Sequence, residues 1–356
     1  MTKKSKSFKF IDLFAGIGGF HIAMHENGGK CVFASEIDKY ARQTYKYNLK
    51  KISHEIFEDG NFNEDITNPK LDYQTIPDFD VLCAGFPCQP FSYAGKNQGF
   101  KDTTRGTLFF SILSILEAKR PKAFLLENVK GLKSHDNGRT LKTIIESLEK
   151  LGYKIHWTIL DSLDFGVPQK RERWYCVGLK NDSSFNFPKG KKEIVKLSAI
   201  VDVKNKNPSL TLPKQETERI DYHFKNMNGI VRVKHDNSQY ESNTKKGKHG
   251  VFSFQKADGA LRFHIGDFSK TQIQEAFYCC LETYAPTIIL NRVPKMWDLK
   301  RKLSVIECQR LQGFPDNYTF PVSDNQAYRQ LGNSIALPVV REITKQLIKT
   351  LNNENK

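Results

Sequence analysis

The sequence has no apolar run that approaches the length of a membrane span. Its first residues, MTKKSKSFKF, carry the lysines of a secretory signal but lack the apolar segment that follows them in such a signal. A membrane-spanning or secreted protein is therefore disfavoured. We expect a cytoplasmic protein that does not act at a membrane.

Cysteine is scarce, and its spacing suits neither a metal site nor a disulfide framework. The seven cysteines form no CxxC pair, and no Cys/His cluster has zinc spacing. An odd count without a secretory signal indicates reduced thiols. We therefore expect no bound metal, and we expect most cysteines to be small buried hydrophobic residues.

The chain carries an excess of positive charge. Over 356 residues the net charge is +16, and the sequence pI is about 9.4. Such an excess attracts polyanions, of which DNA and RNA are the commonest, although some basic enzymes have no polyanionic ligand. The length suits two domains of unequal size, and a hydrophobic fraction of 39% is enough for a core.

The first half alternates short apolar runs with longer periodic segments, as in a mainly parallel α/β sheet. Strands are predicted at 8–14, 31–35, 80–84, 123–127, 155–161 and 174–179. Helices are predicted at 20–26, 39–48, 108–119 and 140–151, and a final helix is predicted near the C-terminal end at 336–351. Ligands of such sheets bind beyond the carboxyl ends of the strands, so the residues after each strand are the candidates for chemistry.

Residues 181–302 are polar and irregular, and they predict a smaller irregular unit. Two segments have the pattern of a helix capping box: residues 271–274, which predict a short helix there, and residues 304–307.

A glycine turn follows the first predicted strand. In Phe14-Ala-Gly-Ile-Gly-Gly19, Gly16, Gly18 and Gly19 let the backbone approach a ligand and leave helix N–H groups free. Glu36, after the next strand, can accept both hydroxyls of a ribose. The spacing is not GxGxxG, which disfavours an NAD-type oxidoreductase. A donor built from a nucleoside and an amino acid fits, and a ligand-free βα turn is the alternative.

Cys88 lies between two prolines in a loop, Gly85-Phe-Pro-Cys88-Gln-Pro90, that follows the buried strand at 80–84. Such a cysteine is held outside the core, where its thiolate can act as a nucleophile if the site lowers its pKa. Cys83, within the strand, is expected to be buried and inert. An ordinary buried cysteine is the alternative for both.

Glu127 ends another apolar strand, where partial desolvation would raise its pKa. Protonated, it could act as an acid catalyst on a ring nitrogen; a helix cap or surface ion pair is the alternative. Arg171 and Arg173 share one face of the strand that follows. They either brace the loop of Cys88 or bond a ligand carbonyl, with plain solvated charges as the alternative.

In this order and spacing, these segments resemble the DNA cytosine-5 methyltransferases of bacterial restriction–modification systems, over residues 10–178 and 301–340. The resemblance implies a Rossmann-like methyltransferase fold, S-adenosylmethionine as donor and double-stranded DNA as partner. It divides the chain into a catalytic donor-binding part at 1–182, a target-recognition domain at 183–324 and a C-terminal segment at 325–356 that completes the catalytic domain.

The resemblance also implies residue roles. Cys88 is the nucleophile, Glu127 begins the base-binding triplet, and Arg173, paired with Arg171, contacts the cytosine O2. A glutamate, Glu64, stands where the family usually has glycine. The residues assigned to the donor are Phe14, Ala15, Gly16, Gly18, Gly19, Glu36, Ile37, Asp65, Ile66, Pro87, Leu108, Asn333 and Ser334.

The middle of the chain corresponds to the region that reads DNA in this family, and Thr287 resembles the threonine of its usual short turn. Phosphate contact is predicted for a set of basic residues, each with a plain solvated charge as the alternative. They are Arg232, Lys234, Lys245, Lys246, Lys248 and Arg292.

The sequence therefore predicts a monomeric enzyme that methylates C5 of a flipped-out cytosine in a specific duplex sequence and protects host DNA from a cognate restriction endonuclease. Two alternatives remain. An RNA cytosine-5 methyltransferase would share the catalytic motifs, and a catalytically inactive DNA-binding protein would share the fold.

Overall fold

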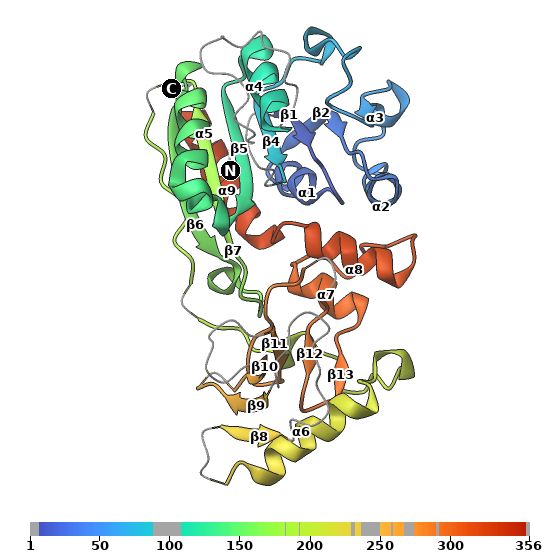
Figure 1. Ribbon diagram of the computed structural model, residues 1–356. Helices are drawn as coiled ribbons and strands as arrows, with labels where there is room; N and C mark the ends of the chain where they lie inside the picture. The colour runs from blue at the N-terminus through green and yellow to red at the C-terminus, as the bar shows by residue number, and fades with distance from the viewer. Residues whose placement is uncertain are drawn as a thin grey trace, which may run out of the picture.

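The computed structural model describes residues 7–87, 108–181, 183–191, 193–228, 232–235, 250–257, 259–266, 274–289 and 292–353 (Figure 1). A seven-stranded sheet in the order β3-β2-β1-β4-β5-β7-β6 forms the larger unit. Its strands are β1 Phe8–Leu13, β2 Gly29–Ser35, β3 Phe62–Asn63, β4 Val81–Gly85, β5 Ala123–Val129, β6 Lys154–Asp161 and β7 Glu172–Leu179. Only β7 runs against its neighbours, so the predicted mainly parallel sheet is confirmed.

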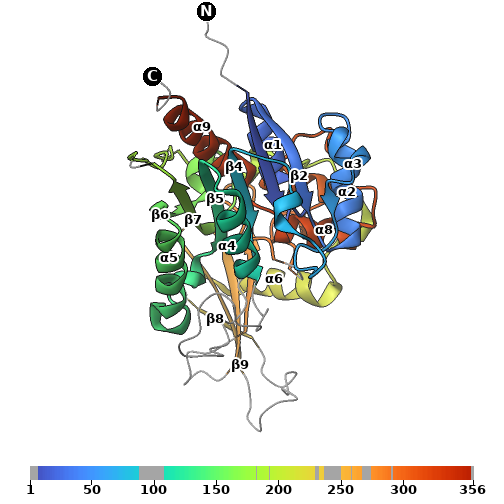
Figure 2. The ribbon, with the colours of Figure 1, turned by 90° about the horizontal axis from the view of Figure 1, so that it is seen from above.

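Helices cover both faces of this sheet (Figure 2). On one face lie α1 Gly19–Glu26, α2 Lys39–Leu49, α3 Glu55–Glu58 and α9 Leu337–Asn353; on the other lie α4 Leu108–Lys119 and α5 Arg139–Lys150. Alternation along the strands explains the two layers, because Leu125 packs in the first core and its neighbours Phe124 and Leu126 pack in the second. Strands buried on both faces read as continuous apolar runs, which is why they could be predicted.

Every predicted strand and helix of this unit is confirmed to within two residues of its predicted bounds. The short β3 and α3 were not predicted, because two to four residues carry too little periodicity to be seen. Within the described residues, no helix is long and apolar enough to cross a membrane.

The polar middle of the chain forms the predicted smaller unit, which contains a second sheet where irregular structure was expected. Six strands stand in the order β13-β12-β11-β10-β9-β8. They are β8 Val233–His235, β9 Gly250–Gln255, β10 Leu261–Gly266, β11 Gln274–Cys279, β12 Lys295–Met296 and β13 Arg301–Lys302. Leu261, Phe263 and Tyr278 pack against Ile220 of helix α6 (Lys214–Asn226) in a small core of their own.

The helix predicted at residues 271–274 is also corrected. Residues 271–273 lie outside the described part, and Gln274 begins β11, which pairs with β10 over five residues. A capping box is a local signal worth about 1 kcal/mol. The pairing of β11 with β10, which begins at Gln274, outweighs this local signal.

The second predicted capping box is confirmed at α7 (Val305–Leu311), where Ser304 and Glu307 cap each other. Glu307 is fully buried, and both of its carboxylate oxygens accept from the guanidinium of Arg301, at 2.7 and 2.8 Å. It also accepts from the Asp202 N–H at 2.9 Å. The Arg301–Glu307 pair holds the end of β13 against the start of α7, where the chain leaves the second sheet. Helix α8 (Asp324–Asn333) follows α7.

Glu307→Ala should lower the free energy of unfolding by about 3–5 kcal/mol, because it leaves the buried Arg301 charge without its partner. Urea unfolding measures the change. Glu146→Ala is the control, since it removes a carboxylate from an exposed pair with Lys142 and should cost less than about 1 kcal/mol. Equal losses in the two variants would contradict this account of the pair.

His21 gives the fold a pH dependence. It is fully buried in α1, between the Tyr45 hydroxyl at 2.7 Å and the Ser53 hydroxyl at 2.9 Å, and burial lowers its pKa to about 3. The unfolded chain takes up a proton here below about pH 6.5, and the folded chain does so only near pH 3. Stability is therefore lost as the pH falls through this window.

Urea unfolding of the wild type and of His21→Gln at pH 7.5, 6 and 5 tests this. The wild type should lose up to about 1.4 kcal/mol more per pH unit than the variant. Identical pH slopes would show that His21 does not titrate as described.

Candidate active site

The residues predicted to carry chemistry gather at one edge of the large sheet. The carboxyl ends of β1, β2, β4 and β5 meet there. Because β7 is antiparallel, its first residues lie at the same edge, with Arg173 opposite Val129 of β5. The single reversed strand thus adds arginines to the edge at which ligands of α/β sheets bind.

The glycine turn after β1 is held open by its backbone geometry. Phe14, Gly16 and Gly18 all have positive φ, of 54°, 53° and 83°. A Cβ added to Gly18 would lie 2.3 Å from Leu49 Cδ1, whereas nothing lies within 4 Å of one added to Gly16. Gly18 is therefore required for packing. Gly16 faces open space, as expected of a cradle for a ligand.

Glu36 closes the turn from β2. Its two carboxylate oxygens accept from the Gly16 N–H at 2.7 Å and from the Asp38 N–H at 2.8 Å. Burial raises the pKa of Glu36, and these two N–H groups oppose the rise. The next residue, Ile37, is 71% exposed and offers an apolar surface beside the carboxylate. Carboxylate and apolar side chain thus border the same turn.

The acidic segment after β3 lies beside this turn. Glu36 N–H donates to the Asn63 carbonyl at 3.1 Å, which places the half-buried Asp65 near the end of β2. Asp65 accepts from the Thr67 N–H at 2.9 Å, and Ile66 is buried. Glu64, at the usual glycine position, pairs with Arg42 of α2 at 2.8 Å.

Other residues predicted for the donor border the same edge. Ala15 is buried, and its N–H donates to the Ser35 carbonyl at 3.0 Å. Gly19 begins α1 and touches Ile335 closely, since an added Cβ would lie 2.5 Å from the Ile335 side chain. Ser334 is therefore near the turn. Of the remaining three, Pro87 and Asn333 are exposed, and Leu108 is half-buried at the start of α4.

Cys88 lies outside the described residues, but the chain leading to it is anchored. Asn128 is buried, and its side-chain amide donates to the Phe86 carbonyl at 2.9 Å. This bond ties the end of β5 to the loop that carries Cys88. Cys83 is fully buried in β4, and burial raises the pKa of its thiol, as expected for an inert cysteine.

Glu127 and Arg173 form a sheltered pair across β5 and β7. Arg173 Nε lies 3.2 Å from Glu127 Oε1, and both side chains are only about a tenth exposed, at 12% and 11%. Burial raises the pKa of Glu127, while Arg173 and then Arg171 oppose the rise. The expected direction is confirmed, and the carboxyl group retains a proton at higher pH than an exposed glutamate.

Arg171 binds other segments of the chain. Its buried guanidinium donates to the carbonyls of Ile288, Gly332 and Ser334, the first two at 3.0 and 3.1 Å. Burial lowers its pKa to about 9. Of the two predicted arginines, Arg171 therefore braces the turn near Thr287 and the C-terminal segment, and Arg173 reaches Glu127.

A second support was missed from the sequence. Gln169 is fully buried; its amide donates to the Leu311 carbonyl at 3.0 Å, and its carbonyl accepts from the Ile288 N–H at 3.0 Å. Gln312 continues the network by donating to the Leu331 carbonyl at 2.6 Å. A glutamine two residues before a predicted functional arginine was the only available signal.

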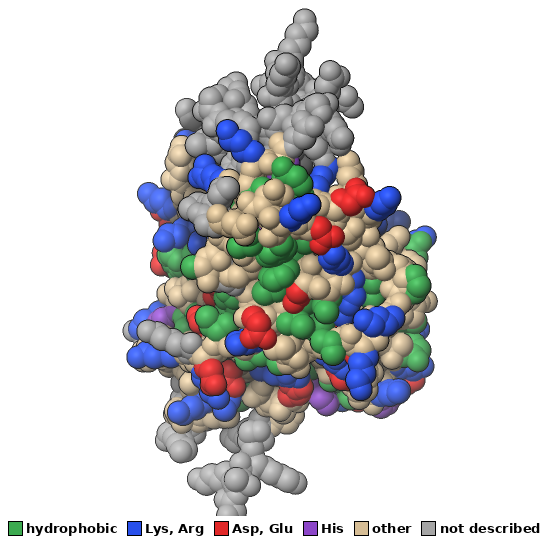
Figure 3. Space-filling model, turned by 90° about the horizontal axis from the view of Figure 1, so that it is seen from below, with side chains coloured by type: hydrophobic (Ala, Val, Ile, Leu, Met, Phe, Trp, Pro, Cys, Tyr) green, Lys and Arg blue, Asp and Glu red, His purple; other side chains and the backbone are tan. Residues whose placement is uncertain are grey.

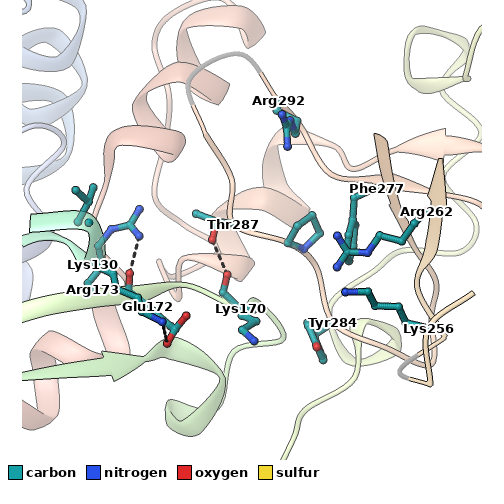
Figure 4. A pocket seen from close by; sticks show the side chains of 13 residues that line it. Lys130, Lys170, Glu172, Arg173, Lys256, Arg262, Phe277, Tyr284, Thr287 and Arg292 are labelled. Carbon is teal, nitrogen blue, oxygen red and sulfur yellow. Dashed lines mark hydrogen bonds and ion pairs between the residues drawn. The ribbon is translucent and has the colours of Figure 1, made fainter. Parts of the chain in front are cut away.

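A basic cleft of about 540 Å³ opens between the two sheets (Figure 4). Six basic residues and one acidic residue line it: Lys130, Lys170, Arg173, Lys256, Arg262 and Arg292, with Glu172. In contrast, the face seen from below carries Lys and Arg side chains interspersed with Asp and Glu (Figure 3). The cleft is therefore a more concentrated positive surface than that face, and Arg173 connects it to Glu127.

Of the three described residues that were predicted to contact phosphate, only Arg292 lines this cleft. Arg232 and Lys234 are exposed elsewhere, and Lys245, Lys246 and Lys248 lie outside the described residues. In the described part of the chain, no group of three or more His, Cys, Asp or Glu residues could hold a metal ion.

Comparison with known proteins identifies one family over nearly the whole chain. A family described as C-5 cytosine-specific DNA methylase matches residues 8–349. The chain is 42% identical over 343 residues to the type II methyltransferase M.NlaX of Neisseria lactamica, covering 96% of each protein. It is 40% identical to M.HpaII of Haemophilus parainfluenzae, over 98% of this chain and 91% of that protein.

Solved structures share the fold at lower identity. The Dnmt2 methyltransferase of S. pombe superposes with a TM-score of 0.65 at 18% identity, over 97% of this chain and 99% of that one. A putative DNA modification methyltransferase from an E. coli prophage gives 0.62 at 20%, with the same coverage. At this identity the likeness concerns the fold alone.

Arg171→Lys should lower the free energy of unfolding by about 2–4 kcal/mol, because one ammonium group cannot replace a planar guanidinium bonded to three carbonyls. Denaturant unfolding measures it. Arg139→Lys, at a side chain 66% exposed, is the matched control and should change stability by less than about 0.5 kcal/mol. A loss at Arg171 no larger than the control's would rule out the bracing role.

Proposed function

The chain belongs to the C-5 cytosine-specific DNA methylase family, and from that premise we propose how its residues perform the reaction. It is a DNA (cytosine-5-)-methyltransferase. The single observation that carries the proposed mechanism is the buried Glu127–Arg173 pair, 3.2 Å apart, beside the loop that leads to Cys88. The Glu127 carboxyl group and the Arg173 guanidinium can thus both polarise a pyrimidine ring that is bound beside them.

We propose S-adenosylmethionine as the methyl donor, which supplies a methyl group on a positively charged sulfur. The turn at Gly16 has room for a ligand, and Glu36 can exchange its N–H partners for ribose hydroxyls. Phe14 and Ile37 offer apolar surface for the adenine, and Asp65 can accept from its amino group. The remaining donor residues are Ala15, Gly18, Gly19, Ile66, Pro87, Leu108, Asn333 and Ser334.

Cys88 is the proposed nucleophile. Its thiolate adds to C6 of the cytosine, and the electron pair of the C5–C6 double bond moves to make C5 nucleophilic. C5 then attacks the donor methyl, and the C–S bond breaks so that S-adenosylhomocysteine leaves as a neutral thioether. A base removes the C5 proton, the double bond re-forms, and the thiolate leaves. Asn128 positions this loop through its bond to the Phe86 carbonyl.

Glu127 and Arg173 lower the barrier to that addition. A protonated Glu127 donates to N3, so negative charge does not accumulate on the ring. Arg173 balances charge at O2 and is pre-oriented by Glu127. Arg171 acts on both indirectly, because its bonds fix the start of β7 against the turn at Ile288.

Double-stranded DNA is the proposed substrate, held in the basic cleft. The target cytosine must leave the duplex stack to reach Glu127, at a cost of a few kcal/mol. Phosphate contacts along the cleft offset this cost and do not read sequence. Residues 183–324 are the proposed target-recognition domain, while 1–182 and 325–356 form the catalytic domain.

The biological role proposed is protection of host DNA from a restriction endonuclease of the same specificity, without a stable complex between the two enzymes. The relatives named type II methyltransferases support it. One site per chain suffices for the reaction, so the proposed enzyme acts as a monomer.

The test uses purified protein, methyl-labelled donor, unmethylated duplex DNA and, in parallel, RNA. Label at cytosine C5 in DNA, absent with Cys88→Ala, is expected. Label only in RNA would favour an RNA methyltransferase. Bound DNA without label would indicate an inactive binding protein.

Glu127→Gln should lower kcat by about 10²- to 10⁴-fold, because glutamine donates a hydrogen bond but cannot transfer a proton. In the wild type, kcat should fall as the pH rises through the pKa of Glu127, which burial holds above its usual value. The variant should lack this fall. The measurement is kcat against pH at saturating DNA and donor, and an unchanged alkaline limb in the variant would exclude Glu127 as the acid.

A further inference from the structure

The two faces of the second sheet have different chemistry. Along β10, Leu261 and Phe263 are buried against α6, at 0% and 3% exposure. Arg262, between them, belongs to the opposite face and lines the basic cleft. The sheet therefore turns an arginine, flanked in sequence by core residues, toward the space where the DNA lies in the proposed function.

The guanidinium of Arg262 lies over an aromatic ring. It stands directly across from Phe277 of β11 in the antiparallel register, and its guanidinium carbon lies 4.1 Å from the centre of that ring. Phe254 of β9 is its register partner on the other side. Stacking of this kind fixes the plane of the guanidinium and lowers the conformational entropy lost on binding.

The lysines of the cleft differ from Arg262 in setting. Lys130, Lys170 and Lys256 are exposed, whereas Arg262 and Phe277 are half-buried on the wall of the cleft. Lys256 begins the tight turn between β9 and β10, where its N–H donates to the Ala260 carbonyl at 3.0 Å. Flexible exposed ammonium groups suit phosphates, whereas a planar fixed guanidinium suits a planar pair of acceptors.

We propose that Arg262, stacked on Phe277, reads a guanine of the target sequence through the N7 and O6 acceptors of its major-groove edge. This inference rests on the proposed function and names one specificity-determining residue for it. Arginine paired with these two atoms is the commonest base-specific contact of proteins with DNA. Arg173 and Arg262 line the same cleft (Figure 4), so one duplex bound there contacts both in the proposed function.

The experiment compares variants on modified DNA. Methylation of genomic DNA first gives the recognition sequence, which must contain guanine on one strand opposite each cytosine. Duplexes are then made with 7-deazaguanine, which lacks the N7 acceptor, at one guanine at a time. The wild type should lose about 10- to 100-fold in kcat/KM at one position, and Arg262→Gln should be insensitive there.

Two further variants separate base reading from phosphate contact. Lys256→Gln should weaken binding to all sequences alike, reduce the salt dependence by about one phosphate contact, and keep the 7-deazaguanine sensitivity. Arg262→Lys keeps the charge, so it should keep the salt dependence and lose most of the sensitivity. Thermal unfolding shows whether each variant is folded. If Arg262→Gln does not fold, the comparison of Arg262→Lys with the wild type still tests the inference.

The inference is overturned if both Arg262 variants retain the wild-type sensitivity at every guanine. It is overturned equally if Arg262→Gln behaves as Lys256→Gln does, losing affinity for all sequences alike. Failure of the proposed function looks different: the wild type itself would then transfer no methyl group to any duplex.

Discussion

Three stretches of chain that are distant in sequence meet at the side chain of Arg171. Arg171 immediately precedes β7. The turn at Ile288 and the C-terminal residues Gly332 and Ser334 accept hydrogen bonds from it through their carbonyls, and it is buried from solvent. A buried cation is costly unless it is hydrogen-bonded, and both terminal nitrogens of this guanidinium donate to carbonyls, while Nε has no partner among the described residues. The three segments are therefore fixed together, and the distances across the site depend on that junction.

The catalytic geometry follows from this junction and from one reversed strand. Antiparallel β7 returns Arg173 to the carboxyl edge of β5, where it meets Glu127 at 3.2 Å. The Ile335 side chain packs closely on Gly19, so the C-terminal segment that Arg171 holds also shapes the glycine turn after β1. The Glu127–Arg173 pair, the glycine turn and the basic cleft are thus parts of one arrangement. Each would shift if the packing around Arg171 changed.

The large sheet and its edge were predictable because strands buried on both faces are continuous apolar runs, and the polar residues that interrupt them stand at strand ends. Glu36, Glu127 and Arg173 were identified in this way. The second sheet was not predicted, because short strands with one polar face, such as that of Arg262, resemble a polar loop. The roles of Gln169 and Arg171 depend on carbonyls more than a hundred residues away, which no local pattern reveals.

The central claim is that Cys88 bonds to C6 of a cytosine that DNA presents beside Glu127. Duplex DNA with 5-fluorocytosine at the target position tests it most directly, because fluorine at C5 cannot leave as a proton and the adduct persists. In the presence of donor we predict a protein–DNA adduct whose mass includes one methyl group and which maps to the peptide of Cys88. An adduct on another cysteine, or none under conditions where ordinary duplex is methylated, would contradict the account.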